Sequence, residues 1–187
     1  VREDASTYHT YYMDVQTGEP RFGKTQQGYA DDSCWSRGQA WGIYGFMLSF
    51  LYTGDKELIS LSKKLANYFL NRLPEDAICH WDLALVGTDA LRDSSSAAIA
   101  VCGLLELVKH LPTTDPDREC YQQWAMGIMS SLSKNYLMGL DEPGTGVLKH
   151  SVYHFASDKG VDECCSWGDY FYVEALVRMT QSWKLYW

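Results

Sequence analysis

Three long segments that are apolar on almost every helical face constrain the fold of this chain most. They begin near residues 33, 94 and 166, and a polar loop that contains aromatic residues precedes each of them. A helix that is apolar all round has to be buried on most sides. Two amphipathic segments, at about 55–71 and 116–136, alternate with them. The alternation predicts inner and outer helices paired as helical hairpins, which is the pattern of an all-α fold of the α/α toroid type.

The ends of the inner helices carry local signals. Asp32 or Ser33 is expected to cap the first inner helix, and Gly54 to end it. Asp93, followed by three serines, is a strong N-cap signal for the second inner helix. The third is expected to end near Trp183.

The first part of the chain has the pattern of β-strands rather than of helices. Residues 6–15 are rich in β-branched and aromatic types, and Thr17-Gly18-Glu19-Pro20 follows them as a turn signal before Arg21-Phe22. This pattern predicts a short N-terminal β-hairpin. Residues 1–187 are therefore expected to form one domain, which consists of this hairpin and the helical repeat.

Composition limits the partners and the compartment. A net charge of -8 argues against nucleic acid as a partner. No segment approaches the ~20 apolar residues that cross a bilayer, so no membrane partner is expected, and Val1-Arg2-Glu3-Asp4 is not typical of a signal peptide. The six cysteines form no C-x-x-C pair and have no histidine at zinc spacing. Reduced thiols, no metal and a cytoplasmic location are the expectation.

The stretch from Ser33 to Trp41 is the leading candidate for a functional site. It places Trp35, Arg37 and Trp41 at a predicted helix start, where unpaired amides attract anions. An anionic sugar could bind there while a tryptophan stacks on its apolar face. In a toroid the loops before the inner helices open on the same end, so Asp93 and Trp167 could line the same pocket. The alternatives are core tryptophans, a structural ion pair for Arg37 and a plain N-cap for Asp93.

Five motifs in order resemble one known family. They are Ser-Cys-Trp-Ser-Arg-Gly-Gln-Ala-Trp-Gly-Ile-Tyr-Gly-Phe (33–46), Thr-Gly-Asp (53–55), Tyr-Phe-Leu-Asn-Arg-Leu-Pro (68–74), Arg-Asp-Ser-Ser (92–95) and Trp-Gly-Asp-Tyr-Phe-Tyr-Val-Glu-Ala-Leu (167–176). From about residue 6 to Trp187 the chain resembles the unsaturated glucuronyl hydrolases, glycoside hydrolase family 88. Related unsaturated rhamnogalacturonyl hydrolases tend to have Arg-Gly-Asn-Gly-Trp where this chain has Arg-Gly-Gln-Ala-Trp.

The resemblance implies a fold and a reaction. The fold is a six-hairpin α/α barrel, of which this chain would form about half. The substrates are lyase-generated oligosaccharides with a 4,5-unsaturated uronic acid at the non-reducing end. An aspartate acts as general acid and base in hydrating the double bond, and no metal or cofactor is needed.

The resemblance also implies a set of binding residues. By their place in the motifs, the sugar pocket would contain His9, Gln27, Trp35, Arg37, Trp41 and Tyr153. Ser157 and Lys159 resemble a segment that binds sulfate in bacterial members, although His154 stands where those members have another serine. Ser157 and Lys159 are thus candidate sulfate-binding residues by a partial match.

One departure from the family concerns catalysis. Members are roughly twice as long, and both aspartates of the mechanism lie in the half that would precede Val1. No catalytic residue is thus expected in this chain, and its partner would be the missing N-terminal half of the same barrel. Five helices cannot close the ring, so apolar inner faces would be exposed. The alternatives are a non-catalytic sugar-binding or vestigial module, and a helical-hairpin interaction domain.

Overall fold

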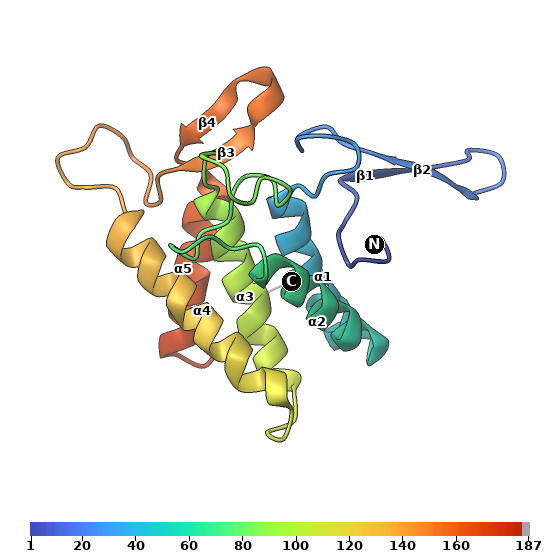
Figure 1. The fold of residues 1–187 in the computed structure, drawn as a ribbon. Helices are drawn as coiled ribbons and strands as arrows, with labels where there is room; N and C mark the ends of the chain where they lie inside the picture. Colours follow the sequence, from blue (N-terminus) through green and yellow to red (C-terminus); the bar gives the residue numbers. More distant parts are fainter. Residues whose placement is uncertain (185–187) are drawn as a thin grey trace.

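The structure, a computed structural model, describes residues 1–184 and is mainly helical (Figure 1). In chain order its elements are β1 (Thr10–Met13), β2 (Pro20–Lys24), α1 (Ser36–Thr53), α2 (Glu57–Leu70), α3 (Ser94–His110), α4 (Pro116–Asn135), β3 (Ser151–His154), the 3-10 turn η1 (Phe155–Ser157), β4 (Lys159–Glu163) and α5 (Ser166–Thr180).

The helices form two layers, as the alternation in the sequence predicted. α3 lies between α1 and α5, and these three are the inner helices. α2 packs on α1, and α4 packs on α3, as outer helices. This arrangement of helical hairpins confirms the predicted repeat, and it brings the N-terminal ends of α1, α3 and α5 to the same end of the molecule (Figure 1).

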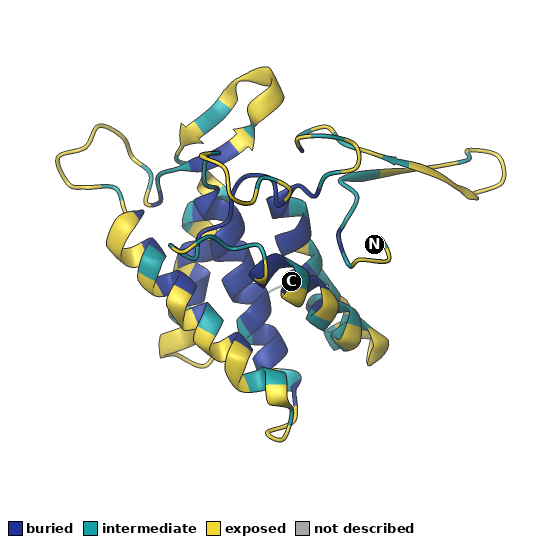
Figure 2. Ribbon diagram, viewed as in Figure 1, coloured by how far each residue is buried: buried dark blue, intermediate teal, exposed yellow. Residues whose placement is uncertain are grey.

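The inner helices differ in how far they are buried (Figure 2). In α3 every residue is buried except Leu105, Lys109 and His110. In α1 seven of 18 residues are buried, and in α5 five of 15. The expectation that all three are buried on most sides is therefore wrong for α1 and α5 within the described chain. Each of them has an inner neighbour on one side only, so its other flank stays open.

The helix ends also correct the sequence prediction in two places. α1 begins at Ser36 with Trp35 at the N-cap position, and no side chain caps it; the predicted cap by Asp32 or Ser33 is wrong. The Ser36 amide instead donates to the Trp81 carbonyl, at 3.2 Å. α5 ends at Thr180, before the expected Trp183.

Two helix-end predictions are confirmed. Gly54 ends α1 with a left-handed φ of 73°, a conformation that glycine adopts without strain. Asp93 caps α3 by accepting from the backbone amides of Ser95 and Ser96.

Two short antiparallel hairpins accompany the helices. β1 and β2 form the predicted N-terminal hairpin, which projects away from the helical body (Figure 1). β3 and β4 form a second hairpin near the N-terminal ends of α3 and α5, which the sequence analysis did not predict. All six cysteines are free thiols. Among residues 1–184, no helix combines the length and the apolar character that a bilayer crossing requires.

Candidate functional site

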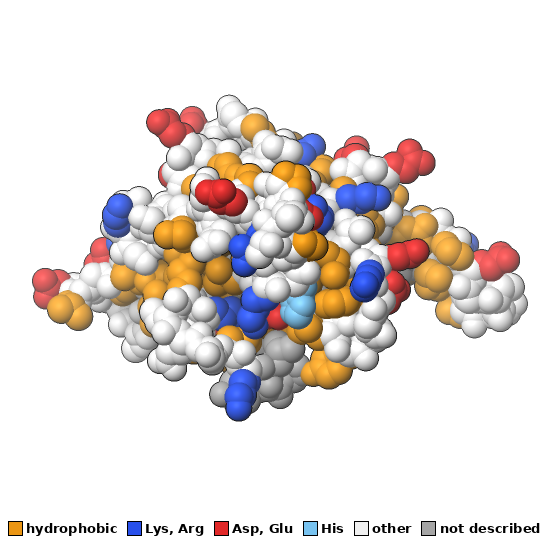
Figure 3. Space-filling model, turned by 90° about the horizontal axis from the view of Figure 1, so that it is seen from below, with side chains coloured by type: hydrophobic (Ala, Val, Ile, Leu, Met, Phe, Trp, Pro, Cys, Tyr) orange, Lys and Arg blue, Asp and Glu red, His pale blue; other side chains and the backbone are white. Residues whose placement is uncertain are grey.

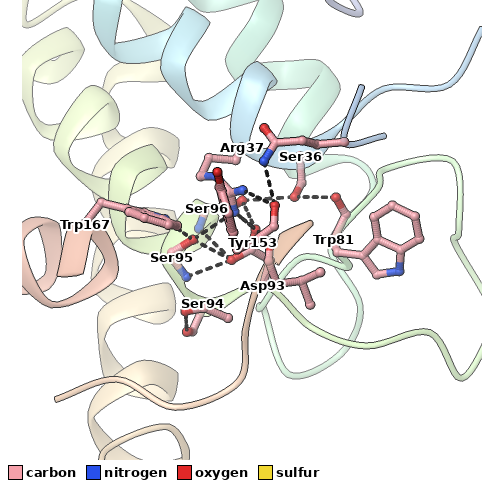
Figure 4. A network of polar contacts seen from close by, with 12 residues as sticks. Ser36, Arg37, Trp81, Asp93, Ser94, Ser95, Ser96, Tyr153 and Trp167 are labelled. Carbon is pink, nitrogen blue, oxygen red and sulfur yellow. Dashed lines mark hydrogen bonds and ion pairs between the residues drawn. The ribbon is translucent and has the colours of Figure 1, made fainter. Parts of the chain in front are cut away.

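Arg37 lies at the centre of a polar network at the N-terminal ends of the inner helices (Figure 4). The residue is 3% exposed, and its guanidinium donates to the Asp93 carboxylate at 2.7 Å. It also donates to the backbone carbonyls of Val152 and Tyr153, each at 2.8 Å. One buried arginine in the first turn of α1 therefore links the start of α3 to strand β3.

The carboxylate of Asp93 is completely buried and surrounded by donors. Besides the guanidinium, it accepts the hydroxyls of Ser95 at 2.5 Å and Ser96 at 2.8 Å, together with both of their backbone amides. With this many hydrogen-bond partners, the carboxylate is closed to solvent. The N-cap role of Asp93 and the structural ion pair of Arg37, stated as alternatives from the sequence, are both confirmed.

A row of stacked groups runs past this network. The rings of His9 and Trp35 lie 4.4 Å apart between centroids. The Arg37 guanidinium lies 4.5 Å from the Trp35 ring and 5.3 Å from the Trp167 ring, and Trp167 lies 5.4 Å from Tyr153. These five residues, here called the ring row, come from the segment before β1, the loop before α1, α1 itself, α5 and β3. Trp35, Arg37, Asp93 and Trp167 therefore lie together, as the shared end of the inner helices predicted; that they line one ligand pocket stays a prediction.

His9 is held in one tautomer by the backbone. Its Nδ1 accepts the amides of Gln26 and Gln27, each at 3.0 Å, so in the neutral ring the proton sits on Nε2. Burial, and after it the positive charges of Arg37 and His154, lower the pKa of His9. His9 is therefore a neutral imidazole that offers a hydrogen-bond donor at Nε2.

Gln27 and Tyr153 are tied together at a shared atom. The Gln27 side-chain amide donates to the Tyr153 carbonyl at 2.8 Å, which is the same oxygen that accepts from Arg37. Because the amide nitrogen is held, the direction of the amide oxygen is fixed as well. The Tyr153 side chain, 44% exposed, stands at the end of the ring row.

The remaining residues predicted for the site lie apart from this network. Trp41 is 38% exposed, and its ring contacts Phe171 of α5 at 5.0 Å. Ser157 and Lys159 are exposed at the tip of the β3–β4 hairpin. His154 pairs with Lys159 across that hairpin, and its Nδ1 is buried without a hydrogen-bond partner.

Several residues of the site were not among the predicted binding residues. The hydroxyls of Ser95 and Ser96 complete the shell of Asp93. The carboxylate of Asp82, also buried, accepts from the Ser33 hydroxyl and the Tyr29 amide and so fixes the loop before α1. Trp81 stacks on Phe155 at 4.5 Å. The run of polar and aromatic types around residues 80–82 was the only signal in the sequence for the last two.

The side chains of the site suit a polar organic ligand. Residues 1–184 contain no group of three or more side chains arranged to hold a metal ion. The ring row instead combines apolar ring faces, a buried cation and a neutral imidazole donor. Aromatic faces and a few fixed polar groups are the features with which proteins bind polar organic ligands such as sugars.

Fold and site together define part of an α/α toroid with an aromatic and cationic cluster at the N-terminal ends of its inner helices. No family model matches the chain. Over its whole length it is 49% identical to an unsaturated chondroitin disaccharide hydrolase of Streptococcus pneumoniae and 40% identical to an unsaturated glucuronyl hydrolase of Bacillus sp. strain GL1. It spans about half the length of these curated relatives, 48% and 50% respectively.

Solved structures agree with the sequence comparison. The unsaturated glucuronyl hydrolase of Streptococcus agalactiae superposes with a TM-score of 0.90 at 49% identity, covering 100% of this chain and 50% of that one. The Bacillus sp. GL1 enzyme gives 0.92 at 40% identity, covering 96% and 48%. The chain corresponds to the C-terminal half of the unsaturated glucuronyl hydrolases, and the expected fold, about half of an α/α toroid, is confirmed.

Proposed function

We propose that this chain supplies the sugar-binding half of a glycoside hydrolase that removes a 4,5-unsaturated uronic acid from lyase-generated oligosaccharides. Two comparisons support the proposal. One relative is named for unsaturated chondroitin disaccharides, and one similar structure, a variant of the Streptococcus agalactiae enzyme, is described as complexed with dGlcA-GalNAc6S. The single observation that carries the proposal is the ring row, in which His9, Trp35, Arg37, Trp167 and Tyr153 are in continuous contact.

The ring row suits an unsaturated uronate for two reasons. The face of a sugar ring packs on aromatic rings, and Tyr153 presents an exposed one. The Arg37 guanidinium holds the Trp35 and Trp167 rings in place beside the sugar, while Asp93 balances its charge. In this proposal Arg37 acts chiefly from behind the sugar, since its donors already reach Asp93 and the β3 carbonyls.

His9 and Gln27 would make the direct polar contacts. The Nε2–H of His9 donates to a sugar oxygen, because Nδ1 is occupied by two backbone amides. The amide oxygen of Gln27 accepts a sugar hydroxyl, while its nitrogen stays on the Tyr153 carbonyl. Both groups are pre-oriented by the protein, which lowers the entropic cost of binding.

Trp41, Ser157 and Lys159 form the outer part of the proposed site. Trp41 would shape the pocket from the open flank of α1 once a neighbouring inner helix covers that flank. Ser157 and Lys159 offer an exposed hydroxyl and an ammonium group on the β3–β4 hairpin. A sulfated second sugar would accept hydrogen bonds from both; without sulfate, they would contribute little.

The proposed reaction hydrates the double bond of the unsaturated sugar. An acid/base aspartate protonates carbon 4 and a water adds to carbon 5; the resulting hemiketal rearranges, and the glycosidic bond breaks. This differs from the displacement at the anomeric carbon that two carboxylates perform. Within residues 1–184, the Asp82 and Asp93 carboxylates are sealed, and Asp169 accepts the Val147 and Leu148 amides. By the family resemblance, the acid/base aspartate would come from the other half of the barrel.

Residues 1–187 would act as part of a single toroid domain rather than as an independent enzyme. The open flanks of α1 and α5 are the surfaces that the N-terminal half of the same barrel would cover. Covering them would bury large apolar side chains that are otherwise exposed, such as Trp41 and Val173.

The test is turnover by the full-length protein. Unsaturated chondroitin, hyaluronan, heparin and gellan-type disaccharides are offered separately, and the ultraviolet absorbance of the conjugated double bond is followed. We expect this absorbance to disappear for at least one of them. A full-length protein that leaves the absorbance unchanged for all four would refute the proposed activity.

A second candidate is a sugar-binding module without turnover. The sealed carboxylates of Asp82 and Asp93 favour it for the chain taken alone, because they leave the ring row without an acid/base group from α3 or its preceding loop. Titration calorimetry of residues 1–187 with the same disaccharides would detect binding. Binding by the chain together with turnover only by the full-length protein would support the enzyme; binding without turnover in both would support the module.

A further inference from the structure

Three consecutive serines at the start of α3 are fully buried but point to different partners. The Ser94 hydroxyl contacts the Ser151 hydroxyl at 2.9 Å. The Ser96 hydroxyl contacts Asp93 and, at 3.0 Å, the Ser36 hydroxyl. Only Ser95 reaches the ring row, through Trp167 and Arg37 (Figure 4).

The hydrogen-bonding capacity of the Ser95 hydroxyl is completely used. It donates its proton to the Asp93 carboxylate at 2.5 Å and accepts the Trp167 Nε1–H at 3.2 Å and an Arg37 N–H at 3.4 Å. A hydroxyl has one donor and two acceptor lone pairs, so this oxygen is saturated. Ser95 thus joins α5 to the buried ion pair between α1 and α3.

Trp167 has the surroundings of a ligand-binding ring rather than of a core ring. It is half-buried, and its single polar group is satisfied by Ser95, so what remains is apolar ring surface. One neighbour is the Arg37 guanidinium at 5.3 Å, and the other is Tyr153 at 5.4 Å, whose side chain is 44% exposed. Arg37 lies between Trp167 and Trp35, so the two indoles share one cation.

We infer that Trp167 is a further sugar-stacking wall of the site, and that Ser95 is the residue that positions it. This inference rests on the proposed function for its sugar-binding part. The Ser95 hydroxyl fixes the indole plane through Nε1 and leaves the ring face beside Tyr153 to the sugar. Without the hydroxyl, the half-buried indole N–H loses its acceptor, and the ring rotates away from the productive orientation.

The chain offers a matched control. Ser94 and Ser95 are adjacent, equally buried, and each hydroxyl bonds to neighbouring side chains, but that of Ser94 reaches only Ser151. Replacing either serine by alanine therefore removes a buried hydroxyl of the same size. A difference between Ser94→Ala and Ser95→Ala reports on Trp167 and the ion pair rather than on general stability.

The experiment uses the full-length protein and unsaturated chondroitin disaccharide. We expect Ser95→Ala to raise KM about tenfold with kcat within about twofold of wild type, whereas Ser94→Ala leaves both within about twofold. Trp167→Phe, which keeps a ring but removes the N–H, should match Ser95→Ala. The double variant should be no worse than either single one, because both changes break the same contact. Trp167→Ala should raise KM about thirtyfold or more.

A second measurement follows the Trp167 indole N–H by NMR, with the signal assigned from its loss in Trp167→Phe. It should exchange with solvent faster in Ser95→Ala than in wild type or Ser94→Ala. Unchanged exchange, or equal kinetics for the two serine variants, overturns the positioning role. An unchanged KM in Trp167→Ala overturns the stacking role alone. A wild-type protein that neither binds nor turns over the disaccharide overturns the stacking role together with the proposed function, while indole exchange still decides the positioning role.

Discussion

Two buried arginines link the same three inner helices at opposite ends, and their surroundings differ. At the upper end Arg37 of α1 pairs with Asp93. Its other contacts are the Ser95 hydroxyl, two β3 carbonyls and two indole rings. Nearer the other end Arg178 of α5 pairs with Glu106 of α3 and with Glu174. Figure 3 shows this lower end from below, with apolar side chains gathered around a few charged ones.

The two networks differ in the groups that they place at the candidate ligand site. The upper network ends in groups that reach the surface, namely Tyr153 and Gln27 on the shared carbonyl. In the lower network the Tyr44 hydroxyl donates to Glu174 and accepts from Arg178, each at 2.7 Å. Glu106 also contacts Lys109 and His110 of its own helix, so the polar groups of this network serve mainly to join helices. The same pairing of arginine and carboxylate thus orients a candidate site in one place and fixes helix packing in the other.

The largest effect should come from opening the lower network. Arg178→Ala leaves the Glu174 carboxylate buried without its cation and leaves Glu106 with only Lys109 and His110, and we expect a loss of about 4 kcal/mol in the free energy of unfolding. Urea unfolding of the full-length protein measures it. Arg178→Ala combined with Glu174→Gln, which removes the stranded charge, should recover part of the loss. A single variant within about 1 kcal/mol of wild type would show that the network is not needed for packing.

Replacing Arg37 in the upper network should lower both the free energy of unfolding and kcat/KM. Arg37→Ala strands the Asp93 carboxylate and should cost about 3 kcal/mol of stability. At temperatures where the variant remains folded, it should also lose about 2 to 4 kcal/mol of transition-state stabilisation, measured from kcat/KM. Arg37→Lys is the control, since it keeps the charge but cannot hold Asp93 and both carbonyls together. Normal kcat/KM in folded Arg37→Ala would make Arg37 a purely structural residue, like Arg178.

The sequence predicted the parts of this comparison that depend on local chemistry. The inner and outer helices follow from apolar periodicity, and the Asp93 cap follows from a side chain that bonds amides two and three residues away. Four of the five residues of the ring row were predicted as pocket residues by resemblance to a family, namely His9, Trp35, Arg37 and Tyr153. The clustering of Trp167 with Arg37 followed from the expectation that loops before inner helices share one end.

The parts that were missed depend on partners distant in the chain. The start of α1 is set by the Trp81 carbonyl and the Asp82 carboxylate, 45 to 49 residues away, so local cap preferences at Asp32 and Ser33 gave the wrong position. Arg37 and Asp93 are 56 residues apart, and nothing local reports their pairing. The flanks of α1 and α5 stay open because each helix packs on only one other inner helix, and an apolar sequence does not report how many neighbours a helix has.

Acid should weaken the lower network by protonating Glu106. Burial alone would raise the pKa of Glu106, but the hydrogen bond and charge of Arg178 outweigh it and leave this pKa below the usual 4.5. A lowered folded-state pKa adds stability above pH 4.5, and this contribution disappears as the pH falls through the folded value. We expect the free energy of unfolding to fall more steeply below about pH 4.5 in wild type than in Glu106→Gln. Parallel curves for the two proteins would contradict this assignment.

The smallest effect separates stability from ligand binding at a single hydroxyl. Tyr44→Phe removes only the oxygen that bridges Glu174 and Arg178, while the two ion pairs of Arg178 remain. We expect a loss of about 1 kcal/mol in unfolding free energy and no change in KM for unsaturated chondroitin disaccharide. Ser95→Ala also removes one hydroxyl that bonds to an arginine and a carboxylate, but in the upper network, and it should raise KM. If Tyr44→Phe also raised KM, the two ends would be coupled through α1, and the lower network would orient the site as well as the helices.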